Sequence, residues 1–438
     1  MPGEENRSVA PSTAPPSRWR LALWPKGWAR LRLLVLLALP LVACLAYALW
    51  TPGVDIRDGR HNLGRNGLWI AHGWLGGDDW FRRYDRDPAP FNDLLEVKRF
   101  LDRASDAQTF DLFPHLCPAT PDGALPPVDD ARVRAFLAAA REHPGGAFRV
   151  MPWIGGVLDR DCFPDRPAWR AAFTANAIAL LERYPDIAGV QVNIEPCPSG
   201  DEGFLALLED MRAALPEGKT LSGAAYPPPT WWHPHPGVHW DEPYFRAVAA
   251  RCDPMAVMMY DAGQRLRKPY IRLMADWTRE VLSWADDTPV LLGVPVYGDE
   301  DSGYHDPSVE NLKSALLGIH AGLSARGGAK PPCQGVAVYA DWEWDDAERA
   351  YWKEHFQYPN INHQRTERRM GHLILPIVVA FSWLIACSLI SGKYRKINEI
   401  RLSEGRDSTN ASLYFTWAGI LGFNAILAIC LIRILLKL

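Results

Sequence analysis

The sequence GVQVNIE at residues 189–195 decides how this chain is interpreted. Its Val and Ile residues are typical of a strand in a sheet that is covered on both faces. Side chains alternate between the two faces of a strand, so Gln191, Asn193 and Glu195 point to the same side. Polar groups on a buried strand are costly unless they are paired or serve a site. We therefore expect chemistry along this row.

Short apolar runs of this kind recur along the chain, and helical patterns separate them. The predicted strands are 68–72, 109–114, 148–153, 189–195, 220–226, 255–260, 290–297 and 335–339. The predicted helices are 92–104, 129–143, 167–184, 201–215, 242–251, 268–285, 307–323 and 345–355. Eight alternations in about 290 residues have the number and size of an α/β fold of the (β/α)8 TIM barrel type. A doubly wound open sheet is the alternative, but the first strand lacks a glycine-rich phosphate motif.

The charge of the chain excludes one class of function. Lys and Arg number 47 and Asp and Glu number 51, which gives a net charge of −4. Both signs are interspersed, so the sequence has no basic footprint for nucleic acid. We therefore predict that the chain has no nucleic-acid partner, while its oligomeric state stays open.

Three long apolar runs flank the predicted barrel at 60–357. The run 33–50 follows a basic segment, 1–32, which predicts a signal anchor with a cytoplasmic tail. A cleaved signal peptide and a lipoprotein signal ending at Cys44 are the alternatives. A separate C-terminal module, 358–438, contains apolar runs at 371–390 and 413–436 with a basic loop between them.

The two C-terminal runs are each about as long as the 20 residues that cross a bilayer. The sequence therefore predicts one N-terminal and two C-terminal transmembrane helices, with membrane lipid as a partner. The barrel would then lie on the periplasmic or extracellular side. An outside location permits disulfides, and Cys162 and Cys197 follow neighbouring predicted strands. A bridge between them is one interpretation, and small buried cysteines are the other.

Aromatic and polar residues gather at the ends of the predicted strands, where barrels of this kind carry their sites. They are Trp69, His72, Trp74, Trp153, Asn193, Glu195, Tyr226, Tyr260, Asp261, Tyr297, Tyr339, Asp341 and Trp342. Aromatic faces with a few carboxylates and amides suit a sugar ring, which has apolar C–H faces and many hydroxyl groups. For any single aromatic residue, packing in the core is the alternative.

Four motifs in order resemble the glycoside hydrolase family 18, or chitinase-like, barrels across residues 67–357. They are Ile154-Gly155-Gly156, the stretch 189–195, Met258-Met259-Tyr260-Asp261 and Gly293-Val294-Pro295-Val296-Tyr297-Gly298. Where that family has aspartates, this chain has Gln191 and Asn193. The sequence Asn193-Ile194-Glu195 instead resembles the strand-four motif of glycoside hydrolase family 85, in which asparagine orients the substrate.

The resemblance implies a hydrolase that cleaves glycans containing β-linked N-acetylglucosamine. Glu195 would be the general acid, and the substrate's own acetamido oxygen would be the nucleophile, so no second carboxylate is required. Asn193 and Tyr260 would orient the acetamido group and complete the catalytic set. The substrate-binding residues would be Gln191, Asp261, Trp74, Trp153, Tyr226, Tyr297, Tyr339 and Trp342. No cofactor and no metal are implied.

The missing aspartates leave other interpretations open. Without a neighbouring carboxylate, only burial can keep Glu195 protonated. A catalytically weak or inactive sugar-binding domain is therefore the first alternative. A retaining glycosidase with two carboxylates, in which Glu300 is the nucleophile, is the second.

Two further clusters have structural interpretations. The loop 231–240 contains His233, His235 and His239 among prolines, and we interpret it as a stiff wall of the groove rather than a metal site. Asp345 and Asp346 are expected to cap the last helix.

Overall fold

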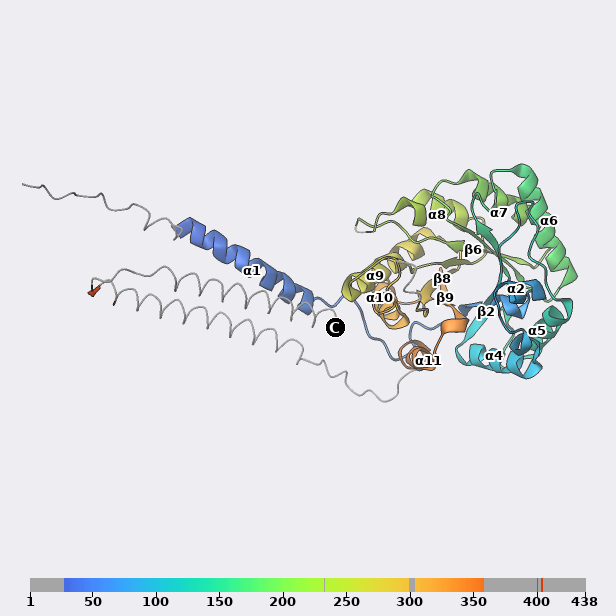
Figure 1. Cartoon of the computed structure of the whole chain (residues 1–438), viewed down its shortest axis with the longest axis horizontal. Helices are drawn as coiled ribbons and strands as arrows, with labels where there is room; N and C mark the ends of the chain where they lie inside the picture. Colours follow the sequence, from blue (N-terminus) through green and yellow to red (C-terminus); the bar gives the residue numbers. More distant parts are fainter. Residues whose placement is uncertain (1–26, 232, 299–303, 358–399, 401–402, 405–438) are drawn as a thin grey trace, which may run out of the picture. The chain divides into compact units, whose positions relative to one another are not determined.

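The computed structural model describes residues 27–231, 233–298, 304–357, 400 and 403–404. One compact unit comprises Thr51–Arg365 and contains the sheet (Figure 1). Its strands are β1 (Asn66–Ile70), β2 (Thr109–Leu116), β3 (Arg149–Val150), β4 (Trp153–Val157), β5 (Gly189–Glu195), β6 (Thr220–Ala225), β7 (Met255–Val257), β8 (Val290–Pro295) and β9 (Cys333–Tyr339).

All of these strands pair in parallel, and the sheet closes on itself because β1 pairs with both β2 and β9. The short strands β3 and β4 both pair with β2, so they are two pieces of one barrel strand. Pro152 lies between the pieces and has no N–H to donate to the ladder. The predicted eight-stranded parallel barrel is therefore confirmed.

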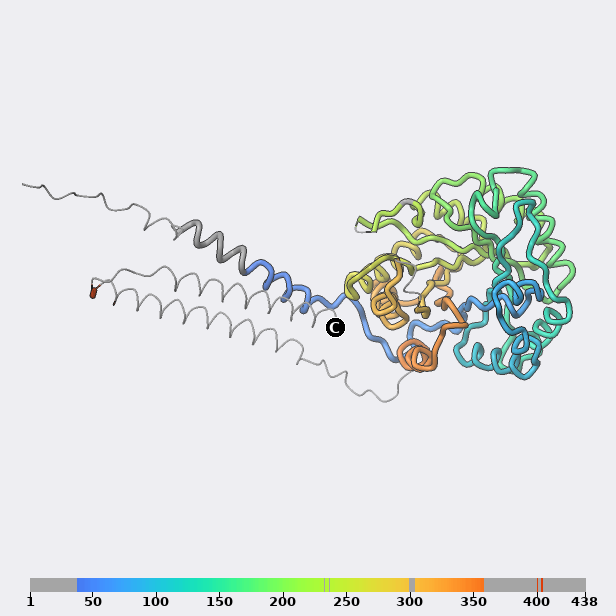
Figure 2. The backbone as a smooth tube through the Cα atoms, in the orientation of Figure 1, coloured from blue at the N-terminus to red at the C-terminus, as the bar shows by residue number. Residues whose placement is uncertain are grey.

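Helices follow the strands along the chain and surround the barrel, as the path of the tube shows (Figure 2). They are α2 (Asp78–Arg83), α3 (Ala89–Asn92), α4 (Leu94–Asp106), α5 (Asp130–Glu142), α6 (Pro167–Arg183), α7 (Glu202–Ala214), α8 (Glu242–Ala249), α9 (Arg267–Trp284), α10 (Leu312–Ala325) and α11 (Asp346–Trp352). Shorter helical turns are η2 (His72–Trp74), η3 (Pro236–Val238), η5 (Asp341–Glu343) and η6 (Lys353–Gln357).

Aspartate side chains fix the starts of several helices by accepting hydrogen bonds from free backbone N–H groups. Asp129, Asp201 and Asp241 do so at α5, α7 and α8. Asp345 accepts from the N–H of Glu348 at the start of α11, which confirms the capping that the sequence predicts there.

The barrel has an inner and an outer core. The inner cluster takes one residue from each of several strands: Trp69, Phe113, Ala256, Leu291 and Ala337. Met151, between β3 and β4, and Ala340, just after β9, complete it. Their neighbours along the strands, such as Leu68 and Ile70, belong to the larger cluster under the helices. This alternation places Gln191, Asn193 and Glu195 on the inner face of the barrel.

The transmembrane part of the predicted fold is wrong: among the described residues, no helix combines the length and the apolar character needed to cross a membrane. The helix α1 (Gly27–Leu49) covers most of the predicted anchor at 33–50 and contains Arg30, Arg32 and Pro40. The runs at 371–390 and 413–436 lie outside the described residues. The barrel's location relative to a membrane stays a prediction.

The disulfide considered between Cys162 and Cys197 is not formed. Both cysteines are free and buried, as are Cys117, Cys252 and Cys333. Cys197 instead lies 3.7 Å from the hydroxyl oxygen of Tyr244. The interpretation of these residues as small buried side chains fits the barrel.

Candidate active site

Two adjoining cavities lie at the carboxyl ends of the barrel strands. The larger has a volume of about 670 Å³ and the smaller about 220 Å³. Both are lined by Glu195, Met258, Tyr260, Asp261 and Tyr304. Glu195 is the last residue of β5, so the strand that the sequence analysis singled out ends between the two cavities.

Glycine lets the neighbouring strand approach the site closely. Gly155 of β4 lies opposite Asn193 of β5. Its φ is +140°, and a Cβ placed there would lie only 1.9 Å from the carbonyl oxygen of Asn193. A side chain at this position would push β5 away, so the Gly-Gly turn sets the place of Asn193 and Glu195.

The polar row of β5 divides into a buried and an accessible part. Gln191 is completely buried, accepts a hydrogen bond from the indole Nε1 of Trp69 at 2.8 Å, and donates to Ser222 at 3.3 Å. It therefore supports the floor of the site. Asn193 lines the smaller cavity, and its Nδ2 donates to Oε1 of Glu195 at 2.6 Å.

The surroundings of Glu195 favour its protonated form. Burial raises the pKa of this carboxyl, and the nearby carboxylate of Asp261 raises it further. Hydrogen bonds from Asn193 and from the Tyr226 hydroxyl, 3.4 Å from Oε2, oppose that rise by stabilising the charged form. A carboxyl group with a raised pKa at a cavity wall is suited to act as a general acid.

Aromatic rings enclose the smaller cavity. The rings of Tyr260 and Tyr339 stack at 5.2 Å between centroids, and Trp69 meets Tyr260 edge-on at 6.4 Å. The other aromatic residues that line this cavity are Trp153, Tyr297, Tyr304 and Trp342. The indole N–H of Trp153 has no hydrogen-bond partner among the described residues. Flat rings around a small polar opening suit the faces of one sugar ring.

A buried network holds the turn that follows Tyr260. Asp261 has a φ of +56°, and its carboxylate accepts a hydrogen bond from the Tyr297 hydroxyl. His305 is buried, with its Nδ1 3.3 Å from Oδ1 of Asp261. Behind them the carboxylate of Glu310 accepts from the backbone N–H groups of Ala262 and Gln264, each at 2.9 Å. Burial raises the pKa of Glu310 to about 7.

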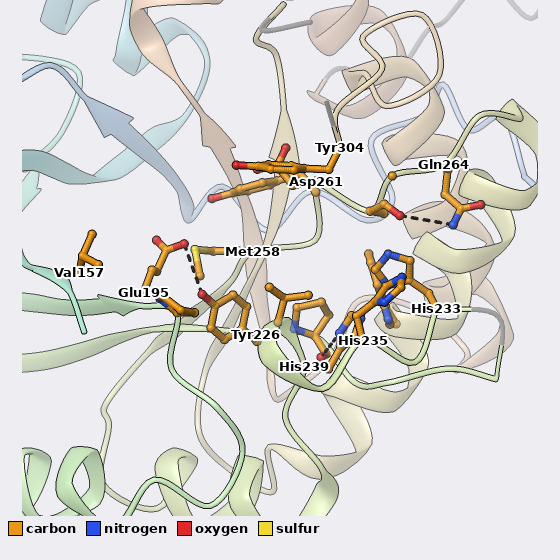
Figure 3. Close-up of a pocket in the computed structure, with 17 residues that line it drawn as sticks. Val157, Glu195, Tyr226, His233, His235, His239, Met258, Asp261, Gln264 and Tyr304 are labelled. Atoms are coloured by element: carbon orange, nitrogen blue, oxygen red, sulfur yellow. Dashed lines mark hydrogen bonds between the residues drawn. The ribbon is translucent and has the colours of Figure 1, made fainter. Parts of the chain in front are cut away.

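The histidine loop after β6 forms the far wall of the larger cavity (Figure 3). Nδ1 of His239 donates to the carbonyl oxygen of Pro227 at 2.9 Å, and its Nε2 lies 2.6 Å from Nδ1 of His233. Burial lowers the pKa of both rings, and that of His233 falls to about 4. No group of three or more His, Cys, Asp or Glu side chains suited to a metal occurs among the residues described. His233, His235 and His239 line the larger cavity and so form part of its wall.

Most of the predicted site residues come together, but Gln191 and Trp74 line neither cavity. The residues that line a cavity are Trp153, Asn193, Glu195, Tyr226, Tyr260, Asp261, Tyr297, Tyr339 and Trp342. Trp74 is 6% exposed and stacks on Phe100 at 4.5 Å in the outer core. Asp341 turns to Arg349, at 3.3 Å. Glu300 lies outside the described residues.

Sequence reasoning missed several residues of the site. Tyr304 and Glu343 line the cavities, and His305 and Glu310 support Asp261. The only signal for Glu343 is its place shortly after a predicted strand end. No local signal marks Tyr304, His305 and Glu310. They lie well beyond the end of β8, and the folded chain returns them to the site.

No family model and no curated protein matches this chain. Solved structures with a similar fold include the spore cortex-lytic enzyme SleL of Bacillus cereus, with 13% identity over 67% of this chain and 75% of that chain, at a TM-score of 0.45. A chitinase of Chromobacterium violaceum has 18% identity over 66% of this chain and 98% of its own, at 0.44. A class V chitinase of Pseudomonas fluorescens has 14% identity over 66% and 99%, at 0.43.

Proposed function

We propose that the protein is a glycoside hydrolase that cleaves β-linked N-acetylglucosaminyl glycans with retention of configuration. The observation that carries the proposal is the position of Glu195: its carboxyl lies between two cavities, and burial raises its pKa. One protonated carboxyl between a place for a sugar and a place for its leaving group is what acid-assisted cleavage requires.

In the first step Glu195 donates its proton to the glycosidic oxygen as the bond to C1 breaks. The acetamido oxygen of the substrate attacks C1 and forms an oxazolinium ring, so the enzyme needs no second carboxylate. In the second step the Glu195 carboxylate takes a proton from water, and the water oxygen opens the ring at C1. Two inversions leave the configuration unchanged and return the proton to Glu195.

Asn193 is suited both to stabilise Glu195 when it is ionised and to bind the substrate. While Glu195 is ionised, Nδ2 of Asn193 donates to it, at 2.6 Å. An amide carries an acceptor oxygen beside its donor nitrogen, so the oxygen is available to the acetamido N–H of a substrate. Asn193 brings no negative charge to offset the oxazolinium cation. The carboxylate of Asp261, which lines the same cavity, supplies one.

The smaller cavity is proposed to hold the sugar that carries the acetamido group. Its volume of 220 Å³ is below the roughly 300 Å³ of most ligand pockets, which suits a single ring. Tyr260 and Tyr339 would lie against that ring, and the indole N–H of Trp153 would meet one of its polar groups.

A sugar-binding domain without hydrolysis is the second candidate, and the contact of Asn193 favours it. A donor 2.6 Å from Oε1 stabilises the ionised form of Glu195, which cannot give a proton. This candidate predicts the same ligands and no cleavage.

The test is a screen of the purified full-length protein against chitin oligomers, peptidoglycan glycan strands and N-glycans from acid to neutral pH, with mass spectrometry of the products. We expect sugars to be released, with the β anomer seen first by NMR. Binding without release would favour the second candidate. Neither binding nor release would reject both.

A further inference from the structure

The structure assigns a selectivity to the larger cavity: we infer that it binds the leaving-group side of the substrate and accepts sugar units that carry no acidic group. This inference rests on the proposed function for its orientation. It specifies the charge of the preferred glycan, which the proposed reaction does not determine.

The orientation follows from which residues line which cavity. Asn193 lines the smaller cavity, while Tyr226 and the histidine loop line the larger one. Glu195 and Val157 lie at one end of the larger cavity and the histidines at the other (Figure 3). Since the general acid must lie beside the oxygen that departs, the space across Glu195 from the acetamido sugar receives the leaving group.

The size of the larger cavity suits more than one sugar ring. Its volume of 670 Å³ is about three times that of the smaller cavity and falls within the roughly 300 to 1,000 Å³ of ordinary ligand sites. Its walls include Pro227, Val238 and Trp277, which offer apolar surface to the faces of sugar rings.

The carboxyl groups around the two cavities are not balanced by cationic side chains among the described residues that line them. Glu195 and Asp261 line both, and Glu343 lines the smaller. Within the described lining of the two cavities there is no Lys and no Arg. The arginines nearest to these residues in the chain have partners of their own. Arg160 lies 2.8 Å from Asp161, Arg265 lies 3.9 Å from Asp306, and Arg267 donates a hydrogen bond to the Ser314 hydroxyl at 3.0 Å.

The two buried histidines of the loop, His233 and His239, add no positive charge to the cavity at neutral pH, while His235, which also lines it, is exposed to solvent. Burial lowers the pKa of His233 and His239, so both rings are neutral there. His305 lies behind the turn, where the carboxyl groups of Asp261 and Glu310 lie 3.3 Å and 3.9 Å from its Nδ1. A protonated His305 is therefore matched by acidic neighbours.

An acidic sugar would lose hydration in this cavity without gaining a cationic partner. A carboxylate that leaves water needs charge-assisted hydrogen bonds or an opposite charge to offset the loss. The larger cavity offers the neutral imidazoles of His233 and His239, the amide of Gln264 and two carboxyl groups instead. A neutral N-acetylated unit is not repelled by these carboxyl groups, and a unit with a protonated amine would be attracted to them.

The experiment compares two disaccharides that differ in one negative charge and one methyl group. In both, N-acetylglucosamine is β-1,4-linked to N-acetylmuramic acid, with the lactyl carboxylate either free or as its methyl ester. Calorimetric binding to the full-length Glu195→Gln variant tests selectivity even when no cleavage occurs, and tri-N-acetylchitotriose tests the proposed hydrolysis separately. We expect the ester to bind at least tenfold more tightly, with a ratio that shrinks as salt screens the repulsion. Equal binding, or tighter binding of the acid, would overturn the inference.

A charge at the rim provides the matched control. Val238 lines the cavity and is 38% exposed, so it tolerates a longer side chain. Val238→Lys should bring the ratio of ester to acid binding down about tenfold, whereas Val238→Met adds length without charge and should leave the ratio as it is. If the Met variant changes the ratio as much as the Lys variant does, bulk rather than charge governs the cavity.

Discussion

Replacement of Asn193 by Asp adds a second carboxylate beside the proposed acid. Nδ2 of Asn193 lies 2.6 Å from Oε1 of Glu195, so the two charge centres in the variant would be about 4 Å apart. At an effective dielectric constant of about 20, two like charges at about 4 Å repel by about 4 kcal/mol. Because the cavity is open to water, we expect a weaker repulsion of about 2.7 kcal/mol. This repulsion raises by about 2 the pKa at which the two carboxyl groups lose their shared proton.

The assay is the pH dependence of kcat/KM. Glu195 must be protonated to act as an acid, so its higher pKa moves the alkaline fall of kcat/KM upward by about 2 pH units. At pH values above the alkaline fall of the wild-type protein, the Asn193→Asp variant should therefore be up to about 100-fold more active. Asn193→Ala is the control, because it loses the same hydrogen bond without adding a charge. The reasoning is refuted if the Asp and Ala variants share one alkaline limb.

Three further predictions concern stability. Gly155→Ala should destabilise the fold by more than about 2 kcal/mol in urea unfolding, because its Cβ would lie 1.9 Å from the carbonyl oxygen of Asn193 at a φ of +140°; an unchanged midpoint would contradict this. Glu310 has a pKa of about 7 in the fold, above the ordinary 4.5, so the folded state holds its proton more tightly and stability should fall by about 1 to 3 kcal/mol as pH rises from 4.5 to 7. Glu310→Gln should flatten that decline, and an equally steep decline would exclude Glu310 as its source. Asp345→Ala should cost about 1 kcal/mol in thermal unfolding, since its side chain caps the N–H of Glu348, and no loss would show that water replaces the cap.

The barrel was predictable because its signals are local. The Val and Ile residues at 189–195 give the observed bounds of β5, and eight such runs separated by helices leave few other folds. The polar row on β5 was predictable for the same reason, since alternation along a strand needs no knowledge of its neighbours.

The ends of elements depend on contacts that the local sequence does not show. Strand β7 ends at Val257, three residues before the predicted end, and a left-handed turn held by Glu310 follows at Asp261. Helix α10 begins at Leu312 rather than at Pro307, because the side chain of Asn311 caps it.

The aromatic residues show a second limit of the sequence. Trp74 and Trp153 both lie at or just beyond predicted strand ends, yet Trp74 stacks in the outer core while Trp153 lines the smaller cavity. An aromatic side chain gains from burial in either place, so its type alone does not decide between them.

The central claim is that Glu195 is the proton donor of a glycoside hydrolase. The most direct measurement is kcat for the full-length Glu195→Gln variant on tri-N-acetylchitotriose, with binding of the same sugar measured in parallel. Loss of the acid should lower kcat by about 10² to 10⁴ while binding is retained, because Gln keeps the shape of the side chain without its proton. A variant that turns over this substrate at the wild-type rate would contradict the claim.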